Sequence, residues 1–336
     1  MTSSPVRFAI LGFGHFASRR LVPAFAKSEQ AVLTGIWRRN QAAAAQNCLE
    51  HAIPNCFPTA EALCTSPDVD AVFITSPDAM HHDDTLLALK HGKAVLCEKP
   101  LAMHADEAEE MVAASVAAGL LFGVGQNFRY NRSLEWMREQ IAAGCIGKPQ
   151  SAHAVYTYPA NLAPRKWIAD LDLACGGPIA DVGVHCIDSL RCVLGQDVVS
   201  VSTLAHTDNP SDSSSRVETS AALQLAMTGD IYASIDVSSL ALYRSLIEVS
   251  GSEGTLIAEN GLTVDRPVDI VLRRAGEIVE AKTIDNSDGY TRMIDSFAQT
   301  LRGVGTFAAT GPDAVHNMRA LDAAYKSWRT GLGELL

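Results

Sequence analysis

VRFAILGFGHFA, residues 6–17, predicts how the N-terminal part of the chain folds. A run of β-branched and aromatic residues leads into Gly12-x-Gly14-x-x-Ala17, and a helical pattern then continues to about residue 29. At such a strand-to-helix turn, Gly12 permits the tight turn, Gly14 lets the backbone approach a pyrophosphate, and Ala17 lets helix and strand pack closely. The alternative is a glycine turn without a ligand. The residues expected to bind a dinucleotide are Gly12, Phe13, Gly14, His15 and Phe16.

The second predicted strand, residues 31–37, ends where a dinucleotide fold often places an acid on the adenosine ribose. This chain has Trp37, Arg38, Arg39 and Asn40 there, so no carboxylate is available for the 2'-hydroxyl. An arginine can instead pair with a 2'-phosphate and stack on adenine. The pattern favours NADP over NAD, and the alternative is a pair of solvated arginines.

Two more strands of buried type end in polar residues. Residues 71–76 are followed by Pro77 and Asp78, and residues 92–100 close with Glu98-Lys99-Pro100. Ligands bind at the carboxyl ends of strands in open α/β sheets. A partly desolvated lysine at such an end is a plausible donor to a substrate oxygen. The alternative for Lys99 is a surface lysine on a loop.

The residues between these two strands contain His81, His82, Asp83 and Asp84, which together resemble metal ligands. We interpret the two acids as belonging to the first turn of a helix, where negative charge is favoured, and expect no metal. Helices at 41–52, 59–64 and 104–118 and a strand at 120–126 complete an alternating pattern. The pattern predicts a doubly wound Rossmann domain over residues 1–127.

The remainder, residues 128–336, has a different pattern. A helix at about 131–143 is followed by strand-like runs with turn signals between them, and several runs alternate apolar and polar residues. Helices are expected near 290–302 and 312–331. The segment therefore predicts an α+β domain. Its strand-like runs are 151–158, 198–207, 218–227, 230–239 and 245–260.

Within this domain, GGPIADVGVHCID, residues 176–188, places Asp181 and His185 four residues apart. In a helix both would lie on one face, with Asp188 farther along the same stripe. A carboxylate can orient an imidazole and raise its proton affinity, which suits proton transfer. The alternative is an amphipathic helix in which Asp181 caps its own N-terminus.

Composition limits the function classes. The 336 residues are 47% hydrophobic and 19% charged, with a formal net charge of -11 and a pI near 5.3. This balance argues against general nucleic-acid binding. The eight cysteines are scattered without zinc-ligand spacing, as expected for reduced thiols. We find no signal-peptide pattern and no apolar run of membrane-spanning length, and so expect a soluble cytoplasmic protein with no membrane partner.

Taken together, GFGHFA, TSPDAMH, the EKP triplet and CGGPIADVGVHCID resemble the Gfo/Idh/MocA oxidoreductase family over nearly the whole chain. The resemblance implies a Rossmann domain followed by a domain with a large, mostly antiparallel open sheet, which in relatives commonly forms a homodimer or homotetramer interface. It also implies a cis Lys99-Pro100 bond. The implied cofactor contacts, beyond the glycine turn, are Trp37, Arg38, Arg39, Ser76, Pro77, His81, Glu98 and Lys99.

The resemblance further implies an NAD(P)-dependent enzyme, with NADP preferred, that transfers a hydride to or from a sugar, cyclitol or related polyol. Lys99, Asp181 and His185 match the catalytic positions of the family. His185 would take the hydroxyl proton, with Asp181 orienting it and Lys99 stabilising the oxyanion, or Lys99 would be the acid/base and His185 the binder. The implied substrate contacts are Lys99, Arg129, Trp167, Asp181 and His185, with Arg165 and Tyr290 more plausible as packing or surface residues.

Three departures from the family pattern stand out: Cys175 where relatives often have a first glycine, Asp78 in place of a frequent asparagine, and Trp37 in place of the acid of NAD users. Two other functions known in the family stay open. One is a non-catalytic cofactor-sensing regulator, which predicts loss of catalytic groups. The other is a glycosidase that uses NAD only transiently.

Overall fold

The chain forms two compact units in the computed structural model, which describes residues 4–160, 166–207 and 217–336. The first unit contains the residues up to Gly125 together with Tyr290–Val315, and the second contains Gln126–Gly289 with His316–Leu336. The sequence interpretation assigned residues 290–315 to the second domain. The structure packs them with the first, because Phe297 of this segment lies against Phe8, with ring centroids 5.7 Å apart.

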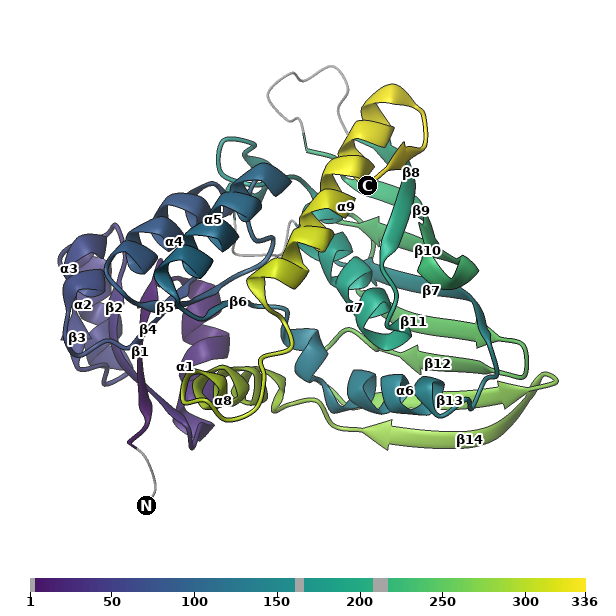
Figure 1. Cartoon of the computed structure of the whole chain (residues 1–336), viewed down its shortest axis with the longest axis horizontal. Helices are drawn as coiled ribbons and strands as arrows, with labels where there is room; N and C mark the ends of the chain where they lie inside the picture. The colour runs from purple at the N-terminus through teal and green to yellow at the C-terminus, as the bar shows by residue number, and fades with distance from the viewer. Residues whose placement is uncertain (1–3, 161–165, 208–216) are drawn as a thin grey trace. The chain divides into compact units, whose positions relative to one another are not determined.

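The first unit is built on a six-stranded parallel sheet in the order β3-β2-β1-β4-β5-β6 (Figure 1). Its strands are short and nearly all apolar, and most of their residues are buried, as expected when helices cover both faces. The strands are β1 (Val6–Leu11), β2 (Ala31–Trp37), β3 (Asn55–Cys56), β4 (Ala71–Ile74), β5 (Ala94–Cys97) and β6 (Phe122–Val124).

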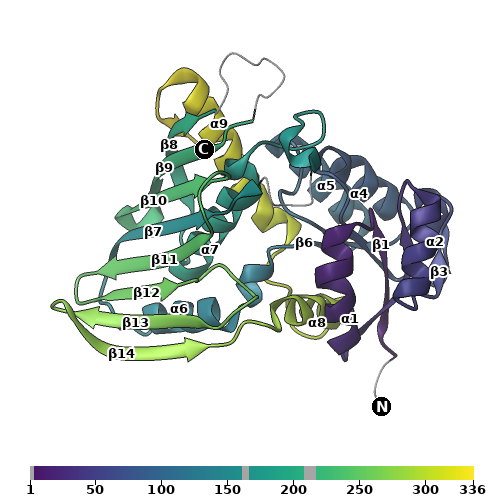
Figure 2. The same ribbon diagram turned by 180° about the vertical axis from the view of Figure 1, so that it is seen from behind.

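Helices connect these strands and cover the sheet. In Figures 1 and 2, α4 and α5 lie on one side of it and α1 and α8 on the other. The elements are the π-helical turn η1 (Ala17–Leu21), α1 (Val22–Lys27), α2 (Gln41–Glu50), α3 (Ala60–Thr65), the 3-10 turn η2 (Asp78–Met80), α4 (His81–Lys90), α5 (Ala105–Ala118) and α8 (Gly289–Leu301).

The second unit is built on a nine-stranded sheet in the order β14-β13-β12-β11-β7-β10-β9-β8-β15. All its pairs are antiparallel except β7 with β10. The strands are β7 (Pro149–Thr157), β8 (Val198–His206), β9 (Ser220–Met227), β10 (Ile231–Ser238), β11 (Arg244–Gly251), β12 (Thr255–Glu259), β13 (Val268–Arg274), β14 (Glu277–Ile284) and β15 (Glu334–Leu335).

One face of this sheet is covered by helices (Figures 1 and 2). Burial alternates along β9 and β10, because every second residue faces these helices. The helical elements are η3 (Asn127–Tyr130), α6 (Arg132–Ala142), η5 (Lys166–Ala169), the π-helical turn η6 (Ile179–Gly183), α7 (Val184–Leu194), η7 (Thr228–Asp230) and α9 (Gly311–Thr330), whose first residues belong to the first unit.

The predicted fold class is confirmed in both units, and most predicted helices and strands are found within a few residues of their expected bounds. Two differences have physical causes. The predicted run 245–260 is two strands, β11 and β12, because the chain turns at Gly251–Gly254. β14 was not predicted, because it is exposed on both faces and so lacks the alternation that marks a half-buried strand. Its partner β13 alternates buried and exposed residues and was missed although it carries that signal.

Candidate functional site

The glycine turn of the first unit joins the carboxyl ends of three strands. The amides of Gly12 and Phe13 donate to the carbonyl of Trp37 at 2.9 and 3.0 Å. Gly12 has φ +91°, and a Cβ there would lie 2.4 Å from the amide nitrogen of Ser76. No other residue type can therefore occupy this position without moving the segment that follows β4.

Gly14 differs from Gly12 in what surrounds it. A Cβ on Gly14 would meet only the carbonyl oxygen of Gly12, at 3.9 Å, so protein does not fill the space in front of it. Ala17 is fully buried at the start of η1, as predicted for close helix–strand packing. Amides of the first helical turn have no acceptor within their own helix. The turn thus offers N–H groups and open space, which is what a bound phosphate requires.

At the end of β2, Trp37 and Arg38 are half-buried and Arg39 is exposed. The Arg38 Nη1 donates to the Asn47 side-chain oxygen at 2.8 Å, so α2 holds this guanidinium beside the strand end. Asn40 caps α2 by accepting from the amide of Ala43 at 3.0 Å. The segment presents cations and an amide where an acid would bind a ribose.

His81 braces two loops at the carboxyl edge of the sheet. It is 1% exposed, and its Nδ1 and Nε2 lie 2.9 Å from the carbonyl of Pro100 and 3.0 Å from that of Ser76. The Ser76 hydroxyl in turn donates to Asp84 at 2.7 Å. Burial raises the pKa of Asp84, and the bond from Ser76 opposes that rise. The side chains of His81 and Ser76 hold these loops, and the predicted cofactor contacts of both residues stay predictions.

The Glu98-Lys99-Pro100 segment follows β5, and the Lys99-Pro100 bond is cis, as the resemblance implied. Glu98 is buried, and its carboxylate accepts from the amide of Lys99 at 3.3 Å. A Cβ on Gly125 would lie 2.7 Å from this carboxylate, so the glycine makes room for it. Lys99 itself is half-buried.

In the second unit, Asp181 and His185 lie on one continuous helical segment, with Asp181 in η6 and His185 in α7. They are only 5% and 7% exposed. The Tyr158 hydroxyl, just after β7, donates to the Asp181 carboxylate at 2.5 Å. The His185 ring packs against Phe128, with centroids 4.6 Å apart. A carboxylate and an imidazole are therefore held in place by residues from other elements.

Sequence reasoning missed Tyr158. The signal was weak: Tyr156 and Tyr158 are two residues apart in a predicted strand and so share a face. The structure places the Tyr156 ring 6.3 Å from that of His185, so both tyrosines serve the same pair. Nothing in the sequence indicated which helix this face would meet.

Asp188, farther along the same helix, is 1% exposed and is paired rather than directed toward a ligand. Its carboxylate accepts from Arg129 Nε at 2.9 and 3.0 Å and from Arg129 Nη2 at 2.6 Å. Asn317 of α9 also donates to it, at 2.7 Å. Two nitrogens of Arg129 bind Asp188, and its contact with a substrate stays a prediction.

Comparison with known proteins fits this geometry. Residues 6–126 match the model of an oxidoreductase family with an NAD-binding Rossmann fold, and residues 134–257 match the GFO/IDH/MocA C-terminal domain. The 1,5-anhydro-D-fructose reductase of Ensifer adhaerens is 33% identical over 285 residues, 84% of each chain. The chain belongs to the Gfo/Idh/MocA oxidoreductase family. As a member of it, the protein is an NAD(P)-dependent oxidoreductase.

A further relative and a solved structure each match nearly the whole length of this Gfo/Idh/MocA oxidoreductase. The D-xylose 1-dehydrogenase (NADP(+)) 2 of Haloferax volcanii is 29% identical over 327 residues, which is 96% of this chain and 98% of that protein. The crystal structure of aldose-aldose oxidoreductase from Caulobacter crescentus complexed with glycerol has a TM-score of 0.90 at 22% identity. It covers 99% of this chain and 100% of that one, and shows the same fold.

Three other residues of this Gfo/Idh/MocA oxidoreductase were considered for the substrate side, and they lie in different surroundings. Trp167 is half-buried in η5. Tyr290 packs edge-on against Phe16 of the glycine turn, with centroids 5.8 Å apart, in keeping with a packing role. Arg165 lies outside the described residues.

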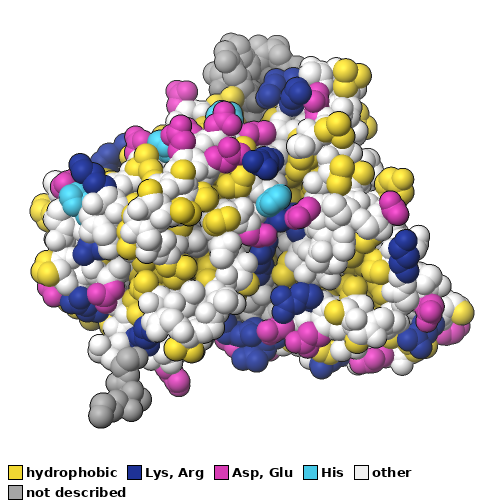
Figure 3. All heavy atoms as spheres, viewed as in Figure 1, with side chains coloured by type: hydrophobic (Ala, Val, Ile, Leu, Met, Phe, Trp, Pro, Cys, Tyr) yellow, Lys and Arg dark blue, Asp and Glu magenta, His cyan; other side chains and the backbone are white. Residues whose placement is uncertain are grey.

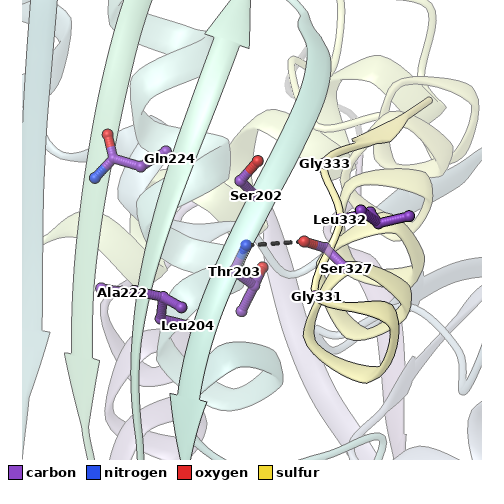
Figure 4. A pocket seen from close by; sticks show the side chains of 9 residues that line it. All are labelled: Ser202, Thr203, Leu204, Ala222, Gln224, Ser327, Gly331, Leu332 and Gly333. Carbon is purple, nitrogen blue, oxygen red and sulfur yellow. Dashed lines mark hydrogen bonds between the residues drawn. The ribbon is translucent and has the colours of Figure 1, made fainter.

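A cavity of about 210 Å³ lies elsewhere in this Gfo/Idh/MocA oxidoreductase, between the β8 edge and the end of α9 (Figure 4). None of its lining side chains is ionisable, so it offers no group for acid–base chemistry. In Figure 4, Ser327 of α9 reaches the strand, accepting from the amide of Thr203 at 2.9 Å. The lining residues are Ser202, Thr203, Leu204, Ala222, Gln224, Ser327, Gly331, Leu332 and Gly333.

The described residues of this Gfo/Idh/MocA oxidoreductase contain no group of three or more His, Cys, Asp or Glu side chains that could hold a metal. No helix among them is long and apolar enough to span a bilayer. On the face seen in Figure 3, Asp and Glu side chains lie among the Lys and Arg side chains, and no continuous basic surface forms there.

Proposed function

We propose that this chain catalyses NADP-linked hydride transfer to or from a carbinol or carbonyl carbon of a sugar, cyclitol or related polyol. The observation that carries the proposal is the buried Asp181–His185 pair, whose carboxylate is hydrogen-bonded by Tyr158 at 2.5 Å. A buried carboxylate and imidazole on one helical segment, held by the bond from Tyr158 and by the ring contact of His185 with Phe128, suit proton transfer at a hydroxyl. The relatives named for anhydrofructose and xylose support a sugar substrate.

The first unit fits a dinucleotide. Gly14 leaves space that a Cβ would narrow, and the amides from His15 onward begin a helix that favours phosphate. Arg38, held by Asn47, would pair with the 2'-phosphate, with Trp37 and Arg39 beside it. Pro77, Glu98 and Lys99 would border the nicotinamide end. When bound, the nicotinamide supplies the hydride acceptor or donor.

The protein's own groups then handle the proton and the charge. In the oxidative direction, His185 takes the hydroxyl proton, and Asp181 stabilises the resulting imidazolium. Tyr158 holds Asp181 in one orientation by donating to it. Lys99 stabilises the negative charge that develops on the oxygen. The exchange of roles between Lys99 and His185 remains the alternative.

The experiment is an absorbance assay at the reduced-nicotinamide wavelength with purified protein. NADPH is tested with 1,5-anhydro-D-fructose, and NADP⁺ and NAD⁺ are tested with D-xylose, other aldoses, inositols and sugar acids. Turnover with one of these classes and a preference for NADP is the expected result. No change in absorbance with any compound of the panel, while NADP binding is measurable by fluorescence, would contradict the enzyme proposal and favour a cofactor-sensing regulator.

The sheet face that lacks helices among the described residues supports a homo-oligomer, and we infer a dimer or tetramer through it. It exposes Leu204 and Tyr232 at 80% and 71%, beside the smaller side chains of Ala222 and Ser234. Light scattering of the native protein and of Tyr232→Glu tests this. A monomeric mass for the native protein, or the same mass for both proteins, would contradict it.

We also propose a cytoplasmic location, since all eight cysteines are free thiols that suit a reducing compartment.

A further inference from the structure

A buried carboxylate, Glu218, lies where the chain enters β9 and is 1% exposed. Its Oε1 accepts from the amide of Ile179 at 2.7 Å and from the Tyr325 hydroxyl at 3.1 Å. Its Oε2 accepts from the amide of Gly177 at 3.1 Å. One side chain therefore ties together the turn before η6, the start of β9 and the helix α9.

The glycine pair before the helix is shaped by these contacts. A Cβ on Gly176 would lie 1.8 Å from the Tyr325 hydroxyl, and one on Gly177 would lie 2.0 Å from the Glu218 carbonyl. Neither position tolerates a side chain while Glu218 and Tyr325 remain where they are. The pair lets the backbone come close enough for the Gly177 and Ile179 amides to reach the carboxylate.

The charge of Glu218 is part of the arrangement. Three donors point at the two oxygens of its carboxylate. Protonation of either oxygen would reduce the number of hydrogen bonds that the carboxyl group can accept. Burial raises the pKa of Glu218, whereas the bonds from Ile179, Gly177 and Tyr325 act against that rise. A carboxylate at this end of the helix also suits the helix dipole.

The turn at residues 176–179, which Glu218 holds, is continuous with the helix that carries the predicted catalytic pair, Asp181 and His185. The amide of Asp181 donates to the carbonyl of Gly177 at 2.9 Å, and the bond from Ile179 to Glu218 lies two residues earlier. Asp181 then meets Tyr158 at 2.5 Å. Any shift of the 176–179 turn therefore moves the Asp181 backbone relative to Tyr158.

We propose that Glu218, together with Tyr325, is a positioning residue that sets the location of Asp181 and His185 for the reaction. The inference rests on the proposed function, because it acts through the roles given to those two residues. The inference predicts that replacing Glu218 or Tyr325 lowers turnover without weakening cofactor binding, since the groups assigned to the cofactor lie in the other unit.

The test compares Glu218→Gln, Tyr325→Phe and, as a matched control, Glu259→Gln at an exposed position of β12. Each is assayed with the best sugar substrate of the panel and NADP. Loss of a hydrogen bond to a charged group predicts that Glu218→Gln lowers kcat about 10- to 100-fold with an unchanged Kd for NADP. Tyr325→Phe keeps the ring packing and lowers kcat less, and Glu259→Gln has no effect.

Combining Glu218→Gln with His185→Ala distinguishes a positioning role of Glu218 from a general loss of folding stability. If Glu218 acts through His185, adding Glu218→Gln to His185→Ala lowers kcat far less than it does in the native chain. Equal losses in both backgrounds, or native kcat in both Glu218→Gln and Tyr325→Phe, would overturn the inference. A native kcat in His185→Ala itself would instead contradict the proposed function, so the two failures are distinguishable.

Discussion

The two units hold their candidate functional groups in different ways. In the first unit, the loops are fixed largely by the backbone: Gly12 touches Ser76, and His81 bridges two carbonyls. In the second, the helix that carries Asp181 and His185 is fixed by side chains from distant elements, Tyr158 and Glu218. Both units need glycines, at Gly12 in the first and at Gly176 and Gly177 in the second, but in the second these glycines serve a buried carboxylate, Glu218, to which several elements donate.

The largest expected effect concerns the buried network of the second unit. Arg129→Met leaves Asp188 buried without its bidentate partner and should lower the free energy of unfolding by about 3–5 kcal/mol. The matched change Arg132→Met breaks an exposed pair with Asp288 and should cost at most about 1 kcal/mol. Urea unfolding measures both. Equal losses would remove the distinction between buried and exposed pairs.

The glycine turn offers the corresponding test in the first unit. Gly12→Ala puts a Cβ 2.4 Å from Ser76 at φ +91° and should destabilise the unit by about 2 kcal/mol or more. Gly14→Ala meets no close protein atom, so its stability should change by less than about 1 kcal/mol while NADP binding weakens about 10-fold or more. Thermal unfolding and fluorescence titration separate the two. Native NADP affinity in Gly14→Ala would show that the open space does not serve the cofactor.

Cofactor choice depends on a side chain in the first unit. Arg38→Ala removes the guanidinium that Asn47 holds and should weaken NADP binding about 10- to 100-fold, because a phosphate loses a charged partner. Binding of NAD should stay nearly constant. Titration of both cofactors against both proteins measures the ratio. A parallel loss for NAD would mean that Arg38 supports the fold of the turn rather than the 2'-phosphate.

The smallest predicted effect concerns Tyr158. Tyr158→Phe keeps the ring and removes the donor to Asp181, so kcat should fall about 10-fold or less. Tyr243→Phe is the matched control, because that hydroxyl pairs with the Ser245 hydroxyl at 3.0 Å rather than with Asp181. Steady-state kinetics with saturating NADP give both values. The same loss in the two variants would remove any special role for Tyr158.

These differences explain what the sequence could predict. The glycine turn, the EKP triplet and the Asp181–His185 spacing are local patterns, so each could be found without knowing the fold. Tyr158 lies 23 residues from Asp181, Glu218 lies 39 from Ile179, and Tyr325 lies 107 from Glu218. Such contacts depend on how sheet and helices meet. For the same reason, the pairing of Arg129 with Asp188 could not be predicted from the sequence.

The most direct test of this account measures kcat and the NADP dissociation constant together for His185→Ala and Lys99→Ala. The account predicts that each change lowers kcat by about 10²- to 10⁴-fold, the usual contribution of acid–base or electrostatic help. It also predicts that His185→Ala leaves NADP binding unchanged, because the cofactor groups belong to the other unit. Near-native turnover in His185→Ala, or a loss of NADP affinity that accounts for its lower activity, would contradict the central claim.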